Sequence, residues 1–88
     1  MYTVWKLPLH PTSIQELEVP IEHQILSAKV INNQGFLWVK VNLESSDDKT
    51  KLKILTIPTG TEFSQSAEYI DTLIYNNGEI IQHIFKIV

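Results

Sequence analysis

ILSAKVINNQGFLWVKVNL, residues 25–43, decides the fold, because it predicts a strand, a turn and a second strand together. Two runs of alternating apolar residues flank the segment NNQG at residues 32–35. Asn and Gly tolerate the positive φ angles that a hairpin connection requires. The stretch is therefore predicted to form a β-hairpin.

The register of this hairpin decides which side chains face the core. We centre the turn on Asn33 and Gln34. The pairs on one face are then all apolar, namely Leu26 with Val41, Ala28 with Val39 and Val30 with Leu37. Since successive side chains of a strand point to opposite faces, we expect this apolar face to be buried.

The opposite face of the hairpin mixes aromatic, basic and small side chains, and its members are Ser27, Lys29, Ile31, Phe36, Trp38 and Lys40. The same register places Lys29 across from Trp38 and Ser27 across from Lys40, close enough for the paired side chains to interact. We expect function on this second face.

Length and composition predict a single globular domain over residues 1–88. A chain of 88 residues buries only roughly 60 to 65% of its unfolded surface, so its core is modest. The absence of cysteine excludes a disulfide scaffold, a thiolate zinc site and a cysteine nucleophile. Neither a long apolar run nor a signal-peptide pattern is found, so we expect no membrane partner and a cytoplasmic location.

The charge balance narrows the class of ligand. A net charge of −3 argues against binding to duplex DNA or RNA, which needs a basic surface. A small anion remains compatible with this charge. All seven basic residues are lysines, so a phosphate would be held by ammonium groups, hydroxyls and backbone amides rather than by a guanidinium group.

Five further segments alternate or run apolar between turn residues, and each predicts a strand: residues 2–7, 14–19, 51–57, 69–75 and 80–88. For residues 14–19 a helical turn is the alternative, because Ser13 and Glu16 match a capping box, but the flanking prolines favour a strand. The whole is predicted to be an all-β domain, a small antiparallel sandwich or partly open barrel of about six or seven strands.

The C-terminal hairpin is joined by NNGE at residues 76–79, where Asn-Gly favours a two-residue type I′ turn. The predicted pairs are Ile74 with Ile81, Thr72 with His83 and Ile70 with Phe85. The other face, which carries Tyr69, Leu73, Tyr75, Ile80 and Ile84, is also largely apolar. A short chain cannot easily cover both faces, so we expect one of them to be buried in a homo-oligomer.

The sequence contains no recognisable catalytic motif. His10, His23 and His83 are far apart and match no metal-ligand spacing, and His83 opposite Thr72 is more typical of a satisfied core histidine. Residues 44–50 predict an exposed turn, in which Asp47 and Asp48 have no third carboxylate at the ligand spacing that calcium needs. No nucleophile elbow, phosphate loop or acid/base pair is found, so we predict a protein that is not an enzyme and has no cofactor.

Two segments supply candidate binding residues. The first is the mixed face of the hairpin, joined by Lys6 and Trp5, where aromatic planes and lysines suit a ligand with bases and phosphates. The second is the turn after Pro58, which presents hydroxyls and backbone amides to an anion. Alternatively, Phe36 and Trp38 fill a subunit interface. The candidates are Trp5, Lys6, Lys29, Trp38, Lys40, Thr59, Gly60 and Thr61.

Five short motifs occur in order along nearly the whole chain: WKLPL at residues 5–9, ILS at 25–27 leading to LW at 37–38, TG at 59–60, YIDT at 69–72 and HIF at 83–85. With these motifs in this order, the chain resembles a widespread family of small phage proteins. We associate that family with the anti-CBASS sponges, which are proteins that sequester the cyclic dinucleotide signals of the host. Members of that family often continue Thr-Gly with His-Pro, whereas Thr61 and Glu62 follow here.

The resemblance implies a viral immune-evasion protein in the host bacterial cytoplasm. It implies a homotetramer that sequesters host cyclic dinucleotides such as 3′,3′-cGAMP without cleaving them. Trp38 or Trp5 would stack on a base, and Lys6, Lys29 or Lys40 would pair with a phosphate. Residues 59–61 would line the pocket. The alternatives are a phage structural or adaptor protein that uses the aromatic face as a protein interface, and a sponge for a cyclic ADP-ribose signal.

Overall fold

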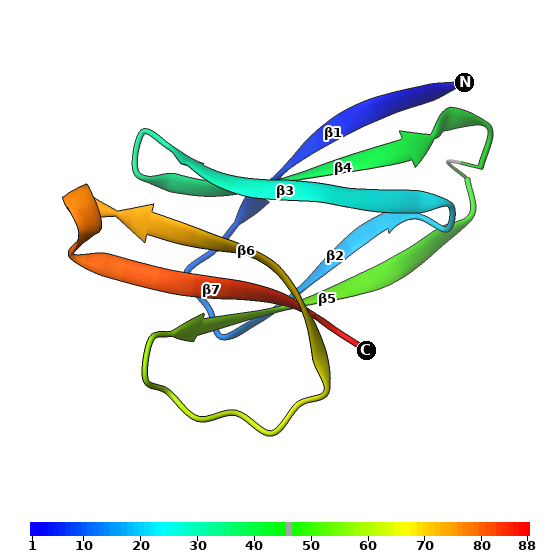
Figure 1. Ribbon diagram of the computed structural model, residues 1–88. Helices are drawn as coiled ribbons and strands as arrows, with labels where there is room; N and C mark the ends of the chain where they lie inside the picture. The colour runs from blue at the N-terminus through cyan, green and yellow to red at the C-terminus, as the bar shows by residue number, and fades with distance from the viewer. Residues whose placement is uncertain (46) are drawn as a thin grey trace.

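The computed structural model describes residues 1–45 and 47–88; Ser46, inside the turn predicted over residues 44–50, lies outside the described residues. Seven strands form two antiparallel sheets (Figure 1). Sheet A has the order β1-β4-β3 and consists of β1 (Tyr2–Leu9), β4 (Gln34–Asn42) and β3 (His23–Ile31). Sheet B has the order β2-β5-β7-β6 and consists of β2 (Ile14–Pro20), β5 (Lys49–Pro58), β7 (Ile80–Ile87) and β6 (Ala67–Tyr75).

This architecture is the predicted all-β antiparallel sandwich. Residues 14–19 lie in β2, which pairs with β5, so the helical alternative is wrong. Two short 3₁₀ turns, Leu43–Ser45 and Asn76–Gly78, follow β4 and β6. Within the described residues, no helix has the length and apolar character needed to cross a membrane.

The core lies between the two sheets and follows from strand alternation. Along β4, Leu37, Val39 and Val41 are fully buried, whereas the intervening Phe36 and Trp38 point outward and are half-buried. The other buried members of the core are Leu9, Val19, Ala28, Leu52, Ile54, Leu73 and Ile84. Sheet A thus turns one apolar face inward and its mixed face outward.

The turn of the first hairpin is Asn32-Asn33, two residues that both adopt positive φ, at 50° and 63°. The register therefore differs by two residues from the predicted one. The five predicted pairs, Leu26–Val41, Ala28–Val39, Val30–Leu37, Lys29–Trp38 and Ser27–Lys40, are wrong. The observed pairs are Ala28 with Leu37, Lys29 with Phe36 and Ser27 with Trp38. Because a shift of two preserves alternation, these residues still lie on their predicted faces.

A β-bulge interrupts β3 between Ile25 and Ser27. The extra residue, Leu26, is 46% exposed instead of facing the core. Beyond the bulge the alternation resumes out of phase, so Ile25 pairs with Val39 and packs against the core.

The C-terminal hairpin has a four-residue connection rather than a two-residue turn, and positive φ angles occur at Asn76, Asn77 and Gly78. The predicted pairs Ile74–Ile81 and Thr72–His83 are confirmed. The pair Ile70–Phe85 is wrong, because a second bulge between Tyr69 and Asp71 pairs Tyr69 with Phe85 instead.

The two sheets approach each other most closely where β3 lies beside β6 (Figure 1). Asp71, directly after the β6 bulge, links them. Its carboxylate accepts a hydrogen bond of 3.1 Å from the backbone N–H of Ala28. It also forms an ion pair with the ammonium of Lys29, at 3.5 Å. This side chain therefore connects one edge of sheet A to the neighbouring edge of sheet B.

Candidate functional site

The outward side of sheet A carries the aromatic and basic side chains that the sequence analysis singled out. Strand pairing arranges them in rows across β1, β4 and β3: Pro8–Phe36–Lys29, Lys6–Trp38–Ser27 and Val4–Lys40–Gln24. Tyr2 lies beyond the last row. We name Tyr2, Lys6, Lys29, Phe36, Trp38 and Lys40 the aromatic–lysine face.

Two lysines of this face lie over aromatic rings. The ammonium of Lys6 is 4.7 Å from the ring centroid of Phe36, and that of Lys40 is 4.6 Å from the ring of Tyr2. The rings of Phe36 and Trp38 meet edge to face with centroids 6.1 Å apart. These cation–π contacts restrain both lysines close to the stacking surfaces.

A hollow of about 230 Å³ lies at one end of the aromatic–lysine face, where Tyr2 and Lys40 form part of its lining. Its other lining residues are Glu22, His23, Gln24 and Asn42, and the side chains of Glu22 and Asn42 are joined by a hydrogen bond of 2.6 Å. The hollow adds depth to a face that is otherwise the open surface of a sheet.

Trp5 does not join the aromatic–lysine face. Because Lys6 points outward from β1, the alternation directs Trp5 to the inner side, where it packs against the core. The ammonium of Lys49 lies 5.5 Å from its ring. The expectation that Trp5 and Lys6 share a face is therefore wrong.

The predicted anion cradle, Thr59, Gly60 and Thr61, follows β5 in sheet B and is not brought together with the aromatic–lysine face of the same chain. The N–H of Thr61 donates to the carbonyl of Pro58, at 3.1 Å, and Gly60 adopts a φ of 90°. The hydroxyl of Thr59 is hydrogen-bonded to His83 at 2.8 Å. Two of the expected anion donors thus have partners within the protein.

The contact between Thr59 and His83 belongs to a longer chain of hydrogen bonds on the outward side of sheet B. Nδ1 of His83 lies 3.1 Å from the hydroxyl of Thr72, which lies 2.8 Å from that of Tyr69. Both ring nitrogens of His83 are therefore partnered, as predicted, but the residue lies on the outward side of sheet B and not in the core, so that part of the prediction is wrong. We name Thr59, Tyr69, Thr72 and His83 the hydroxyl–histidine chain.

Tyr69, Thr72 and His83 are not among the candidate binding residues predicted from the sequence. The available signal was the predicted pairing of Thr72 with His83, together with the motifs that contain Thr59, Tyr69 and Thr72. Only the fold brings these motifs to one face.

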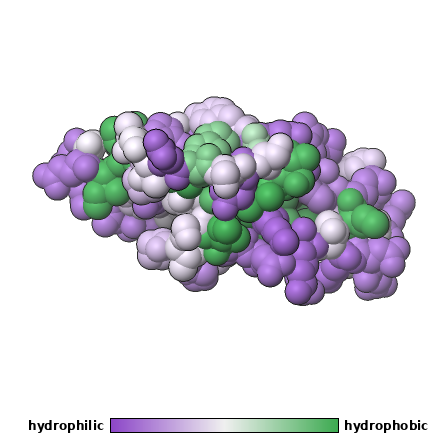
Figure 2. Space-filling model, turned by 90° about the horizontal axis from the view of Figure 1, so that it is seen from below, coloured by the Kyte–Doolittle hydropathy of each residue, from purple (hydrophilic) through white to green (hydrophobic). Residues whose placement is uncertain are grey.

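Aromatic and aliphatic side chains surround the hydroxyl–histidine chain. Phe85 contacts Phe63 and Tyr69, with ring centroids 5.2 and 5.8 Å apart. Ile74 and Ile81 are exposed beside them. Figure 2, seen from the side of sheet B, shows hydrophobic side chains exposed among hydrophilic ones.

The described residues contain no group of three or more His, Asp or Glu side chains that could hold a metal ion. The chemistry that the aromatic–lysine face offers is stacking on aromatic rings and charge neutralisation by ammonium groups. The hydroxyl–histidine chain adds hydroxyl and imidazole groups on the opposite side of the molecule.

A family model described as a domain of unknown function, DUF7352, matches residues 1–87. No curated protein and no solved structure matches the chain. The match includes every strand of both sheets, so both faces described above lie within one family unit.

Proposed function

We propose that this chain, which belongs to the DUF7352 family, is a phage immune-evasion sponge that binds host cyclic dinucleotides such as 3′,3′-cGAMP without cleaving them. The observation that carries the proposal is the position of Trp38, half-buried between Lys6 and Ser27 on an open sheet face, with Lys29 and Lys40 in the adjacent rows.

The chemistry of a cyclic dinucleotide matches this face. Its bases present flat π surfaces, and stacking on an aromatic side chain contributes about 1 to 3 kcal/mol per base in single-strand-binding proteins. Its two phosphates need cations, which Lys6 and Lys40 supply as ammonium groups. Lys29 adds a third ammonium group, which is already paired with Asp71 in the same chain. Trp38 is the proposed stacking residue, and the inward position of Trp5 leaves it no such role.

An oligomer is part of the proposal. Thr59, Gly60 and Thr61 lie on the other sheet, so they would line the same ligand pocket only if a second copy contributed them. A cyclic dinucleotide has near two-fold symmetry, and a two-fold subunit interface supplies equivalent contacts to its two halves. We therefore propose a homo-oligomer, with a tetramer as the expected state.

Isothermal calorimetry with 3′,3′-cGAMP at micromolar protein tests the proposal, and saturable binding heat is expected. Trp38→Ala should weaken binding about 5- to 150-fold, the equivalent of one lost stacking contact. Lys6→Ala should also weaken it, whereas Lys53→Ala, an exposed lysine on the outward side of sheet B, should not. Nucleotide released from the complex should be intact.

The titration also discriminates against other activities. Absence of heat with every cyclic di- and trinucleotide tested would remove the proposal. Recovery of degraded nucleotide would make the protein an enzyme instead of a sponge. Heat with a cyclic ADP-ribose alone would retain sequestration but change the signal.

A second candidate function is a phage structural or adaptor protein that uses the aromatic–lysine face as a protein interface. The exposed apolar side chains on the same side of sheet A, Tyr2, Val4 and Ile31, favour it. Co-sedimentation of the protein with purified virions, without bound nucleotide absorbing near 260 nm, would support this function over the sponge.

A further inference from the structure

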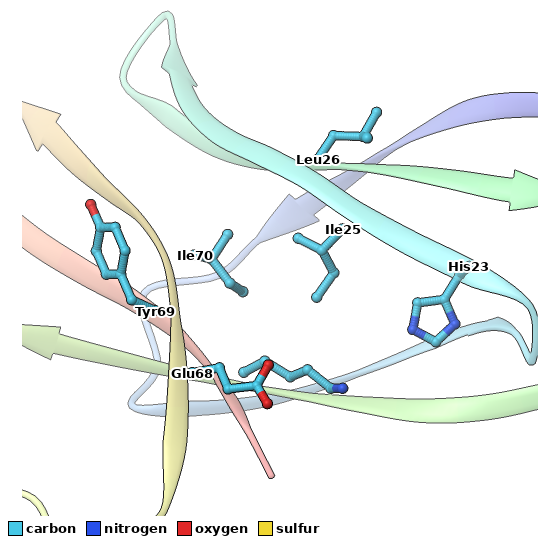
Figure 3. A pocket seen from close by; sticks show the side chains of 7 residues that line it. His23, Ile25, Leu26, Glu68, Tyr69 and Ile70 are labelled. Carbon is cyan, nitrogen blue, oxygen red and sulfur yellow. The ribbon is translucent and has the colours of Figure 1, made fainter.

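A separate cavity of about 390 Å³ opens between the two sheets, where β3 lies beside β6 and β7 (Figure 3). We name it the seam pocket. Its lining includes His23, Ile25, Leu26, Glu68, Ile70 and Lys86. The volume is within the range of small-molecule sites.

Two of the three strands that border the seam pocket, β3 and β6, carry a β-bulge at this level. One extra residue, Leu26, interrupts β3, and another, Ile70, interrupts β6. Bulges bend strands and recur next to binding and active sites. Just beyond the bulges, the hydrogen bond between Asp71 and Ala28 joins β6 to β3. The two strands are therefore linked at that level, and the pocket opens on the other side of the bulges.

The polar groups around the seam pocket retain free hydrogen-bonding capacity. Nδ1 of His23 lies 2.8 Å from the carbonyl oxygen of Pro20, and because a carbonyl only accepts, Nδ1 carries the proton. In the neutral ring Nε2 then keeps its lone pair. Within the described residues, no side-chain hydrogen bond or ion pair involves His23 Nε2, Glu68 or Lys86.

Glu68 and Lys86 are direct cross-strand partners on β6 and β7, so one negative and one positive group stand side by side at the pocket. Figure 3 shows His23 and Glu68 on opposite sides of the cavity and the side chains of Ile25 and Ile70 facing each other between the strands. The charges of Glu68 and Lys86 in this lining are equal and opposite. The pocket is thus complementary to a small molecule that carries both charges and an apolar body.

We propose that the seam pocket binds a small zwitterion with an apolar side chain, either a free amino acid or a short peptide. Lys86 receives the carboxylate of the ligand. Glu68 accepts from its ammonium, His23 Nε2 offers a second acceptor, and Ile25 and Ile70 contact the apolar side chain. None of these five residues belongs to the aromatic–lysine face, although His23 also lines the hollow at its end. Glu68 and Lys86, which carry the charge recognition, lie away from that face, so the proposal does not depend on nucleotide binding.

Titration of the ¹⁵N-labelled protein, followed by ¹H–¹⁵N NMR, tests this inference with L-leucine and L-phenylalanine as probes. Saturable shifts are expected at the amides of residues 23–26, 68–70 and 86. N-acetyl-L-leucine lacks the ammonium and L-leucinamide lacks the carboxylate, so each should bind about tenfold more weakly than L-leucine. Titration with L-leucyl-L-leucine distinguishes a peptide site from an amino-acid site. Tighter binding of the dipeptide than of L-leucine would indicate a peptide ligand, and the reverse would indicate a free amino acid.

Matched variants separate specific binding from nonspecific shifts. Glu68→Gln and Lys86→Gln should each weaken leucine binding about tenfold. Glu16→Gln and Lys53→Gln alter another directly opposed acid–base pair, on the outward side of sheet B, and should leave binding unchanged. The well-dispersed spectrum of each variant verifies that it folds. Absence of saturable shifts with every zwitterion, or unchanged binding by both Glu68→Gln and Lys86→Gln, would overturn the proposal.

Discussion

At the scale of single residues, the side chain of Asp71 links the two sheets through its contacts with Ala28 and Lys29. Burial by itself would raise the pKa of its carboxyl group. Hydrogen bonds from the backbone N–H groups of Ala28 and Thr72, together with the charge of Lys29, outweigh burial and hold the pKa below its ordinary value of 3.8. The carboxylate form is therefore the one that the folded protein favours.

Asp71→Asn should lower the free energy of unfolding by about 1 to 2 kcal/mol at neutral pH, because hydrogen bonds to a charged acceptor are replaced by weaker ones. A carboxyl group with a depressed pKa contributes stability above pH 3.8, and this contribution is lost as the pH falls through the folded-state pKa. Urea denaturation of both proteins should thus show the difference shrinking well below pH 3.8.

Glu62→Gln, in the exposed connection between β5 and β6, is the matched control. It should change the free energy of unfolding little, both at neutral pH and well below pH 3.8. If the difference between Asp71→Asn and the unmodified protein were the same at both pH values, the charge of Asp71 would not be the source of the stabilisation.

At the scale of elements, the two hairpins have the same two local features. Each has asparagines at positive φ in its connection and a bulge in its first strand. The bulges at Leu26 and Ile70 occur on strands that lie beside each other in the sandwich, and the seam pocket opens between them. The turns fix the pairing of each hairpin, and the bulges shape the space between the sheets.

The turn Asn32-Asn33 is expected to be sensitive to side-chain type. Asn33 has a φ of 63°, where a β-branched side chain clashes with its own backbone. Asn33→Val should therefore lower the free energy of unfolding by about 1 to 2 kcal/mol, measured by urea denaturation. Asn33→Gly, which accepts positive φ freely, should be at least as stable as the unmodified protein. Equal stability of the valine variant would contradict the observed turn.

At the scale of the whole molecule, both sheets leave apolar side chains on their outward sides. On the outward side of sheet B these include Tyr69, Ile74 and Ile81, together with Phe63 from the connection between β5 and β6, and Ile74 is 56% exposed. Such an area of exposed apolar surface favours self-association. Sheet A also exposes Val4, but among the lysines of the aromatic–lysine face.

We expect light scattering of the purified protein to give four times the mass of the 10.1 kDa chain. Ile74→Lys places a charge on the apolar side of sheet B and should lower the measured mass. Val4→Lys adds the same charge to the outward side of sheet A and should leave the association of sheet B intact. A mass of one chain in dilute solution would contradict the oligomer and the shared ligand pocket proposed with it.

The grouping of the aromatic–lysine face was predictable from the sequence even though the hairpin register was not. The segment NNQG offers three positions for a two-residue turn, and they differ in register by an even number of residues. Because the alternation of a strand has a period of two, Lys29, Phe36, Trp38 and Lys40 lie on the same outward face in either register. The inward position of Trp5 follows from the same alternation, once Lys6 is placed outward.

The sequence by itself determined the seven strands, the two hairpins and the outward face of sheet A, because alternation and turn residues are local properties of the chain. Only the tertiary structure decided the bulges at Leu26 and Ile70, the meeting of Thr59 with His83 and the seam pocket. A bulge depends on how a strand packs against the other sheet, and residues far apart in sequence meet only when the sheets stack. Both are consequences of long-range packing, which no local pattern encodes.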